Sequence, residues 1–156
     1  MFRKAIQLLF AVALMFVAAQ IVEQFAPVAL TNPPVRSDLS APPEVKSILR
    51  RACYDCHSNE TRWPWYSGVA PASWLIRDHV LEGRRRLNFS IWGDYAYDSG
   101  TEAQKLSEIA KFATNGKMPP WYYTMTHPGA RLTSMEREAV ARWATTQKAG
   151  NQPSSR

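Results

Sequence analysis

The sequence is short and has very few cysteines. It holds 156 residues, of which only two are cysteine. Two cysteines cannot cross-link a disulfide-rich scaffold, and they cannot supply the four sulfur ligands of an iron–sulfur cluster or a structural zinc site. The length allows one domain and hardly two, which excludes a TIM barrel or a large doubly wound enzyme. Whatever chemistry Cys53 and Cys56 perform, they perform it as a pair.

The sequence also has little excess charge of either sign. The formal net charge is only +6, and two of the basic residues, Arg3 and Lys4, lie at the extreme N-terminus. The remaining excess is too small for the electrostatic footprint of a nucleic-acid-binding domain, so no nucleic-acid partner is expected. We interpret the basic triplet at residues 84–86 as a solvated face or a helix end. The moderate hydrophobic content of 46% argues against both full disorder and a multi-span membrane protein.

One long hydrophobic run is present, at the N-terminus. Residues 5–22 carry no charge, and as a helix they would be about 27 Å long, close to the thickness of the hydrocarbon core. Residues 1–22 are therefore expected to be a single-span anchor. Arg3 and Lys4 would lie on the inner, cytoplasmic side of the inner membrane, and everything after Glu23 would lie on its outer side. The alternative is a cleaved signal sequence, for which residues 17–19 offer a cleavage site.

The rest of the chain divides into a tether, a domain and a tail. Residues 23–43 hold five prolines, which predicts an extended tether, and residues 149–156 are expected to be a flexible tail. Between them, residues 44–148 show helical periodicity, no alternating strand pattern and no internal repeat, which predicts a small all-α domain. Four helices are expected. The first begins at Pro42 or Pro43, carries an apolar stripe of Val45, Ile48, Leu49, Ala52 and Cys53 at helical spacing, and delivers Cys53 at its end. The second runs from Ala72 or Ser73 to Glu82, with Gly83 as its C-cap. The third opens with the capping box of Thr101 and Gln104 and stops at Asn115 and Gly116, and the fourth opens with the capping box of Thr133 and Glu136. The aromatic segments 63–66 and 88–97 are expected to be irregular.

The motif Cys53-Tyr-Asp-Cys56-His57 carries the chemistry. Two thiols at this spacing can reach the vinyl groups on one edge of a haem, and the adjacent histidine can then offer an imidazole nitrogen to the iron, so C-x-x-C-H predicts covalent attachment of one haem c. A thioredoxin-like redox pair would need a βαβ setting that the sequence lacks. A zinc site would need two more ligands, such as His79 and His127, and an exported chain could instead form a disulfide.

The second iron ligand is expected to be Met118. It lies with two prolines directly after the third expected helix, and a thioether on a proline-stiffened loop is well placed to meet the iron from the side opposite His57. The alternatives are that Met118 fills core space, that His127, Met125 or His79 is the ligand, or that the position stays open.

The sequence resembles the monohaem c-type cytochromes and, more narrowly, the bacterial haem-binding domain proteins. The most specific part of the match is Cys-Tyr-Asp-Cys-His-Ser-Asn-Glu-Thr at residues 53–61. Further matches lie at residues 32–35, 63–67, 70–71, 83–84, 87–90, 92, 118–120 and 127–128, so that the resemblance covers about residues 30–145. It implies a cytochrome c-like helical fold, covalent haem c on Cys53 and Cys56, a proximal His57, a distal Met118 and a periplasmic location, anchored or free.

Aromatic residues are dense around both parts of the expected haem site. Haem contacts are predicted for Trp63, Trp65, Tyr66 and Trp121, since a small domain that wraps a large apolar cofactor needs such surface. Arg84 is expected either to pair with a propionate or to be a surface charge.

The function expected from these features is single-electron transfer with an unidentified redox partner protein, and no catalytic residue is assigned. The alternatives are a haem-based sensor or small-ligand-binding module with a displaceable sixth ligand, and a peroxidase-like enzyme.

Overall fold

The structure is a computed structural model that describes residues 2–26 and 29–150. It separates into two compact units, unit 1 with residues Met1–Thr31 and Arg62–Glu82, and unit 2 with Asn32–Thr61 and Gly83–Arg156. The described residues are helical without a β-strand, apart from an isolated bridge between Ser37 and Ile91, so the predicted all-α class with a preceding apolar helix is confirmed.

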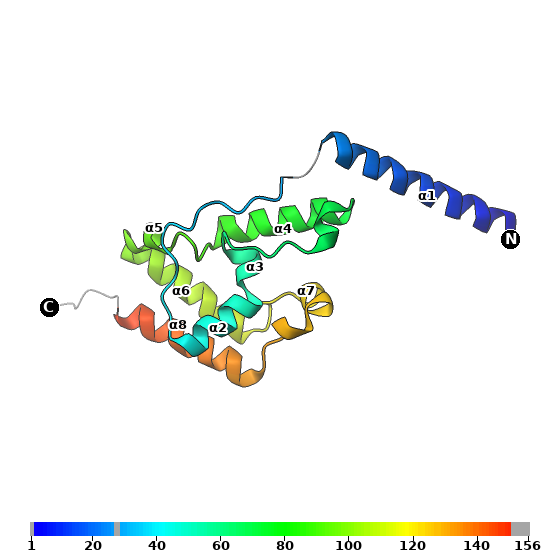
Figure 1. The fold of residues 1–156 in the computed structure, drawn as a ribbon. Coiled ribbons are helices and arrows are strands. Elements are labelled where there is room, and N and C mark those ends of the chain that lie inside the picture. Colours follow the sequence, from blue (N-terminus) through cyan, green and yellow to red (C-terminus); the bar gives the residue numbers. More distant parts are fainter. Residues whose placement is uncertain (1, 27–28, 151–156) are drawn as a thin grey trace. The chain divides into compact units, whose positions relative to one another are not determined.

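Figure 1 shows the order of the elements. They are α1 (Phe2–Phe25), α2 (Pro43–Ala52), α3 (Tyr54–His57), the 3-10 helix η1 (Trp65–Gly68), α4 (Ala72–Arg86), α5 (Trp92–Ala96), α6 (Ser99–Thr114), α7 (Trp121–Thr126), the 3-10 helix η2 (Pro128–Ala130) and α8 (Ser134–Gly150).

In unit 1, α1 is the apolar helix expected from the sequence. It has 24 residues, and an 18-residue window within it has a mean hydropathy of 2.4, so it is long and apolar enough to cross a membrane. None of its side chains is fully buried. It continues to Phe25, three residues into the expected tether. Residues 29–42 form no helix, whereas residues 27–28 lie outside the described part of the chain. The expected tail begins inside α8, and its residues 151–156 are likewise outside that part.

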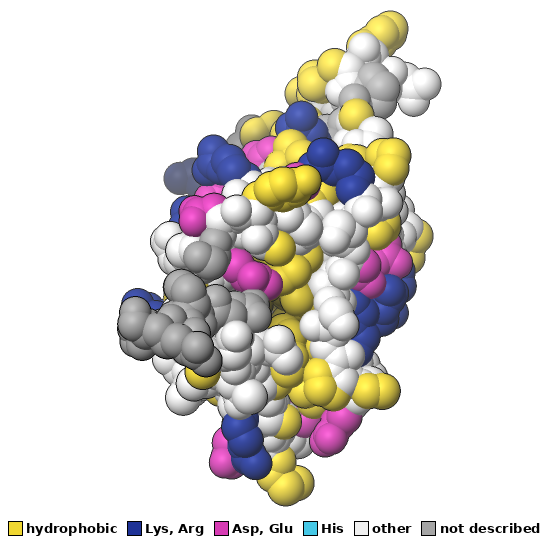
Figure 2. All heavy atoms as spheres, turned by 90° about the vertical axis from the view of Figure 1, so that its left-hand side faces the viewer, with side chains coloured by type: hydrophobic (Ala, Val, Ile, Leu, Met, Phe, Trp, Pro, Cys, Tyr) yellow, Lys and Arg dark blue, Asp and Glu magenta, His cyan; other side chains and the backbone are white. Residues whose placement is uncertain are grey.

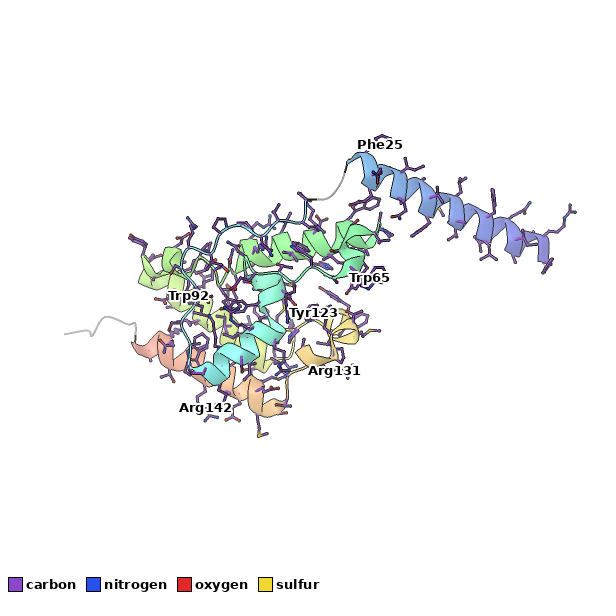
Figure 3. The ribbon with its side chains drawn as sticks, viewed as in Figure 1. Phe25, Trp65, Trp92, Tyr123, Arg131 and Arg142 are labelled. Carbon is purple, nitrogen blue, oxygen red and sulfur yellow. The ribbon has the colours of Figure 1, made fainter. Side chains whose placement is uncertain are left out.

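In unit 2, α2, α6 and α8 enclose the hydrophobic core. Helix α6 packs along α8, and α2 packs on α8. The α2 stripe follows the predicted spacing, because Val45, Ile48, Leu49 and Ala52 are all buried. Trp92 from α5, labelled in Figure 3, joins this core. On the face drawn in Figure 2, basic and acidic side chains are interspersed rather than segregated, which agrees with the small excess of positive charge.

One of the two expected capping boxes is present. The Glu136 carboxylate accepts a hydrogen bond from the Thr133 backbone N–H at 2.8 Å, and the Thr133 hydroxyl accepts one from the Glu136 N–H at 3.2 Å. The other expectation is wrong, because α6 begins two residues before Thr101. Asp98 is its N-cap and accepts from the backbone N–H groups of Gly100 and Thr101. The aspartate carboxylate, itself a preferred N-cap, replaces the threonine hydroxyl in this role.

The aromatic segments are more regular than expected. Residues 63–66 lead into η1, and residues 88–97 contain α5. Short helical turns of this kind leave little periodicity in a sequence, because each exposes and buries only a few side chains.

The expected C-cap at Gly83 is wrong, because α4 runs on to Arg86. The reason for a glycine at this position is a close helix contact. A Cβ atom on Gly83 would lie 2.5 Å from the backbone oxygen of Cys56 and 3.2 Å from its Cβ. Only a residue without a side chain allows α4 to approach the cysteine motif this closely.

Replacement of Gly83 by alanine should therefore destabilise the protein although alanine favours helices. Overpacking of this kind costs about 1–3 kcal/mol. The measurement is the free energy of unfolding in urea. The control is Gly129→Ala, since a Cβ there would meet nothing within 4 Å and should leave the stability nearly unchanged. Equal stability of the two variants would contradict the packing explanation.

Candidate functional site

Unit 2 contains a pocket beside the cysteine motif. Its volume is about 550 Å³, within the range of roughly 300–1,000 Å³ typical of small-molecule and cofactor sites. Most of its lining is apolar. The lining residues are Leu49, Cys53, His57, Arg86, Leu87, Phe89, Lys105, Glu108, Ile109, Phe112, Ala113, Met118, Leu132 and Val140.

The motif forms a tight helical turn at the wall of this pocket. Helix α2 ends at Ala52, and the backbone bends at Cys53 before α3 begins. The carbonyl oxygen of Cys53 then accepts hydrogen bonds from the N–H groups of both Cys56 and His57, at 3.2 and 2.9 Å. Cys53 and His57 both line this pocket, whereas Cys56 is not among its described lining residues.

His57 is held in one tautomer. Its Nδ1 lies 3.0 Å from the carbonyl oxygen of Gly83 and 3.1 Å from that of Leu87. Carbonyl oxygens only accept, so Nδ1 carries the proton and Nε2 keeps its lone pair. Burial lowers the pKa of His57 and outweighs these two hydrogen bonds, which act in the opposite direction. The site therefore presents a neutral, oriented imidazole, which is the form that binds a metal ion.

Both cysteines are free thiols. Burial raises the pKa of Cys53 to about 12, and the neighbouring Cys56 acts in the same direction. Burial likewise raises the pKa of Cys56 to about 11, with a smaller contribution from Asp55. Redox-active cysteine pairs have a lowered pKa instead, so this environment does not favour a thioredoxin-like pair. Among residues 2–26 and 29–150, no cluster of three His, Cys, Asp or Glu side chains suits a zinc ion.

The loop that follows α6 brings Met118 to the pocket. Gly116 adopts a φ of +70°, the left-handed conformation that lets the chain turn after the helix. Arg137 of α8 donates hydrogen bonds to the carbonyl oxygens of Ala113 and Met118, both at 3.1 Å. The Met118 N–H donates a hydrogen bond to the carbonyl oxygen of Phe112 in α6. Met118 is 37% exposed and lines the pocket, and Cys53 is the other sulfur-containing residue among the described lining residues.

The other candidates for the second iron ligand lie elsewhere. His127 stacks on the ring of Tyr123 with 4.2 Å between centroids, and its Nδ1 is near the Tyr123 carbonyl oxygen. Met125 is 65% exposed, and His79 belongs to unit 1. None of the three is among the described residues that line the pocket.

A buried polar network positions Phe89, which lines the pocket. The Phe89 N–H donates to the carbonyl oxygen of His57 at 2.8 Å. On either side of it, Asn88 donates to the Asn59 side chain, and Ser90 accepts from the Asn59 N–H, both at 2.9 Å. The segment that carries Phe89 is thus hydrogen-bonded directly to the end of the cysteine motif.

None of the other predicted cofactor contacts, Trp63, Trp65, Tyr66, Trp121 and Arg84, is among the described residues that line the pocket. Trp63, Trp65 and Tyr66 belong to unit 1, whereas Trp121 lies on α7 with 73% of its surface exposed. Arg84 donates to the Ser58 carbonyl oxygen at 2.7 Å and to the side chains of Asn32 and Thr61. Its pairing with a propionate stays a prediction, as do the four aromatic contacts.

Sequence reasoning missed two basic residues at the pocket, Arg86 and Lys105. Lys105 donates to the Arg86 carbonyl oxygen at 2.7 Å and lies 3.7 Å from Glu108. The available signal was a second stripe on α6, in which Lys105, Glu108, Ile109 and Phe112 recur at helical spacing. Because Lys105 and Glu108 are charged, the stripe does not stand out as an apolar helix face in the sequence.

Tyr123 links α7 to the cysteine motif. Its hydroxyl lies 2.8 Å from a carboxylate oxygen of Asp55, which stands between the two cysteines. Figure 3 shows Tyr123 beside the short helix α3. The segment after Met118 is therefore hydrogen-bonded to the motif that carries the thiols.

Tyr54, the other residue between the cysteines, is fixed by Asp38. Its hydroxyl donates to Asp38 at 2.7 Å, and Lys46 donates to the same carboxylate at 2.7 Å. The Tyr54 ring stacks on Phe89 with 5.0 Å between centroids. Burial alone would raise the pKa of Asp38, but the hydrogen bonds from Lys46 and Tyr54 outweigh it and lower the pKa.

The contribution of Asp38 to stability should depend on pH. Because its pKa is lower in the folded state, this contribution is fully present above the unfolded pKa of about 3.9 and is lost as the pH falls through the folded value. The free energy of unfolding should therefore differ more between wild type and Asp38→Asn at about pH 6 than at about pH 3. Urea titrations at both pH values measure this. The control is Asp94→Asn, an exposed carboxylate paired with Arg36; the same pH dependence there would contradict the assignment.

The residues of the pocket fit a haem. A largely apolar cavity holds an oriented imidazole, a thiol and a thioether, which are the side chains that bind haem iron or its vinyl groups. Comparison with known families gives a match to the haem-binding domain over residues 11–146. No curated protein and no solved structure matches the chain. The match covers most of the sequence, and the chain belongs to the haem-binding domain family.

Proposed function

We propose that this protein is a c-type cytochrome that carries single electrons at the outer face of the inner membrane. The observation that carries the proposal is the meeting of Cys53, His57 and Met118 at one apolar pocket, with the Nδ1 of His57 tied to two carbonyl oxygens.

Each side chain has a distinct role. Cys53 and Cys56 would hold the haem through thioether bonds, His57 would bind the iron through Nε2, and Met118 would bind it through its sulfur. The bound haem supplies a one-electron iron couple. The hydrogen bonds from His57 to Gly83 and Leu87 fix the ring plane and increase the basicity of Nε2.

The surrounding residues exclude water and balance charge. Leu49, Phe89, Ile109 and Val140 are buried and give the pocket an apolar wall, which limits the solvent access that otherwise sets a haem potential. Arg86 and Lys105 add two positive charges at the same pocket, against one negative charge from Glu108, and the excess suits the propionate groups.

The hydrogen bond from Arg137 to the Met118 carbonyl oxygen supports electron transfer over ligand sensing. A loop tied to both α6 and α8 keeps its side chain in place, whereas a displaceable ligand needs a mobile loop. Helix α1 would anchor the domain in the membrane, and the mild positive charge suits an acidic redox partner protein.

Covalent attachment predicts that haem stays with the polypeptide under denaturing conditions. Acidified organic solvent should extract no haem from the wild type and all of it from the double variant Cys53→Ser, Cys56→Ser, because serine forms no thioether to a vinyl group. Haem staining after denaturing electrophoresis measures this. Wild-type protein that loses its haem on extraction would exclude c-type attachment.

Loss of the Met118 sulfur should open one position on the iron. Wild type is expected to be six-coordinate and low-spin, with the weak long-wavelength band of thioether-bound ferric haem and no carbon monoxide binding; Met118→Ala should lose this band and bind carbon monoxide. Absorption spectra of both oxidation states measure this.

The control for this experiment is Met125→Ala, which removes an exposed thioether and should leave the spectra unchanged. A wild type that binds carbon monoxide without denaturant would overturn electron transfer in favour of a ligand-binding module.

A further inference from the structure

The last turns of α1 are hydrogen-bonded to a distant segment of unit 1. The Gln20 side chain donates to the Ala70 carbonyl oxygen at 2.8 Å and accepts from the Ala70 N–H at 3.3 Å. One turn later, the Glu23 carboxylate accepts from the Ser73 hydroxyl at 3.0 Å and from the Trp74 indole N–H at 2.7 Å. These contacts place residues 70–74 at the level where α1 ends.

That level is defined by the length of α1. From Lys4 to Glu23 the helix rises about 28 Å at ~1.5 Å per residue, and the hydrocarbon core of a bilayer is about 30 Å thick. If Lys4 lies at one headgroup layer, Gln20 and Glu23 lie at the other. Residues 70–74, which are bonded to them, then lie at the boundary between hydrocarbon and headgroups as well.

Large hydrophobic side chains are exposed at this end of unit 1. Phe25 is 85% exposed, Trp65 86%, Leu75 60% and Trp74 36%. Figure 3 shows Phe25 and Trp65 projecting from the ribbon. Tryptophan is enriched at both interfaces of a bilayer, because its ring is apolar while its N–H is polar. In water alone, four such exposed side chains in one small unit would be unfavourable.

We propose that these four residues (Phe25, Trp65, Trp74 and Leu75), the interfacial patch, insert into the headgroup region of the bilayer that α1 spans. The ligand is the phospholipid interface itself, and the hydrogen bonds of Gln20 and Glu23 hold the patch at the correct depth. The partner of Trp65 is then lipid and not haem. This inference depends on the proposed membrane insertion of α1 and is independent of haem attachment and electron transfer.

The test uses the full-length holoprotein, labelled with 5-fluorotryptophan, in phosphatidylcholine nanodiscs. Trp65→Phe, Trp74→Phe and Trp143→Phe assign three of the ¹⁹F resonances. Spectra are compared between discs with and without a lipid that carries a gadolinium chelate on its headgroup. The haem is in the same oxidation state in both samples, so its own effect cancels in the intensity ratio.

Trp65 and Trp74 should lose most of their intensity in the gadolinium discs, and Trp143, buried in the core of unit 2, should lose much less. Losses at Trp65 and Trp74 no greater than that at Trp143 would overturn the proposal, and would favour a protein partner for the patch. Extraction of the chain from membranes by alkaline carbonate would overturn it too, since α1 would then not span the bilayer. Either result leaves the haem spectra, and with them the proposed haem attachment and electron transfer, untouched.

Discussion

Helix α4 approaches the cysteine motif so closely at Gly83 that the backbone of the helix, and not a side chain, meets the ring of His57. Two consequences follow from this contact. The carbonyl oxygens of Gly83 and Leu87 fix the tautomer and the plane of the imidazole, and the absence of a Cβ lets the Cys56 backbone lie against the helix. The orientation of His57 and the position of Cys56 both depend on this single approach.

Much of the site could be predicted from the sequence, because its chemistry is local. The spacing of Cys53, Cys56 and His57 is contained within one helical turn, and it leaves few other functions open. The stripe of α2 and the capping box of Thr133 and Glu136 are local patterns too, and the structure reproduces both. The position of Met118 after a helix and before two prolines was informative for the same reason, since it marks a loop.

The features that the sequence did not reveal depend on contacts between distant segments. A glycine near the end of a helical pattern predicts a C-cap, but Gly83 is required by Cys56, which lies far away in sequence. In the sequence alone, Lys105 and Arg86 look like surface charges. The structure shows that α4 and α6 bring both residues to one pocket. Trp65 lies close in sequence to the cysteine motif, yet it belongs to the unit that contains α1.

The pocket wall and the hydrophobic core share Leu49, Phe89, Ile109, Ala113 and Val140. A cofactor at this position is therefore part of the core, and it contributes to folding by mass action. A cofactor held by non-covalent contacts stabilises the native state by an amount that becomes smaller as the concentration of free cofactor decreases. Two thioether bonds would remove that dependence, because the cofactor could no longer dissociate. Once loaded, the domain would keep its stability even where no pool of free haem is maintained.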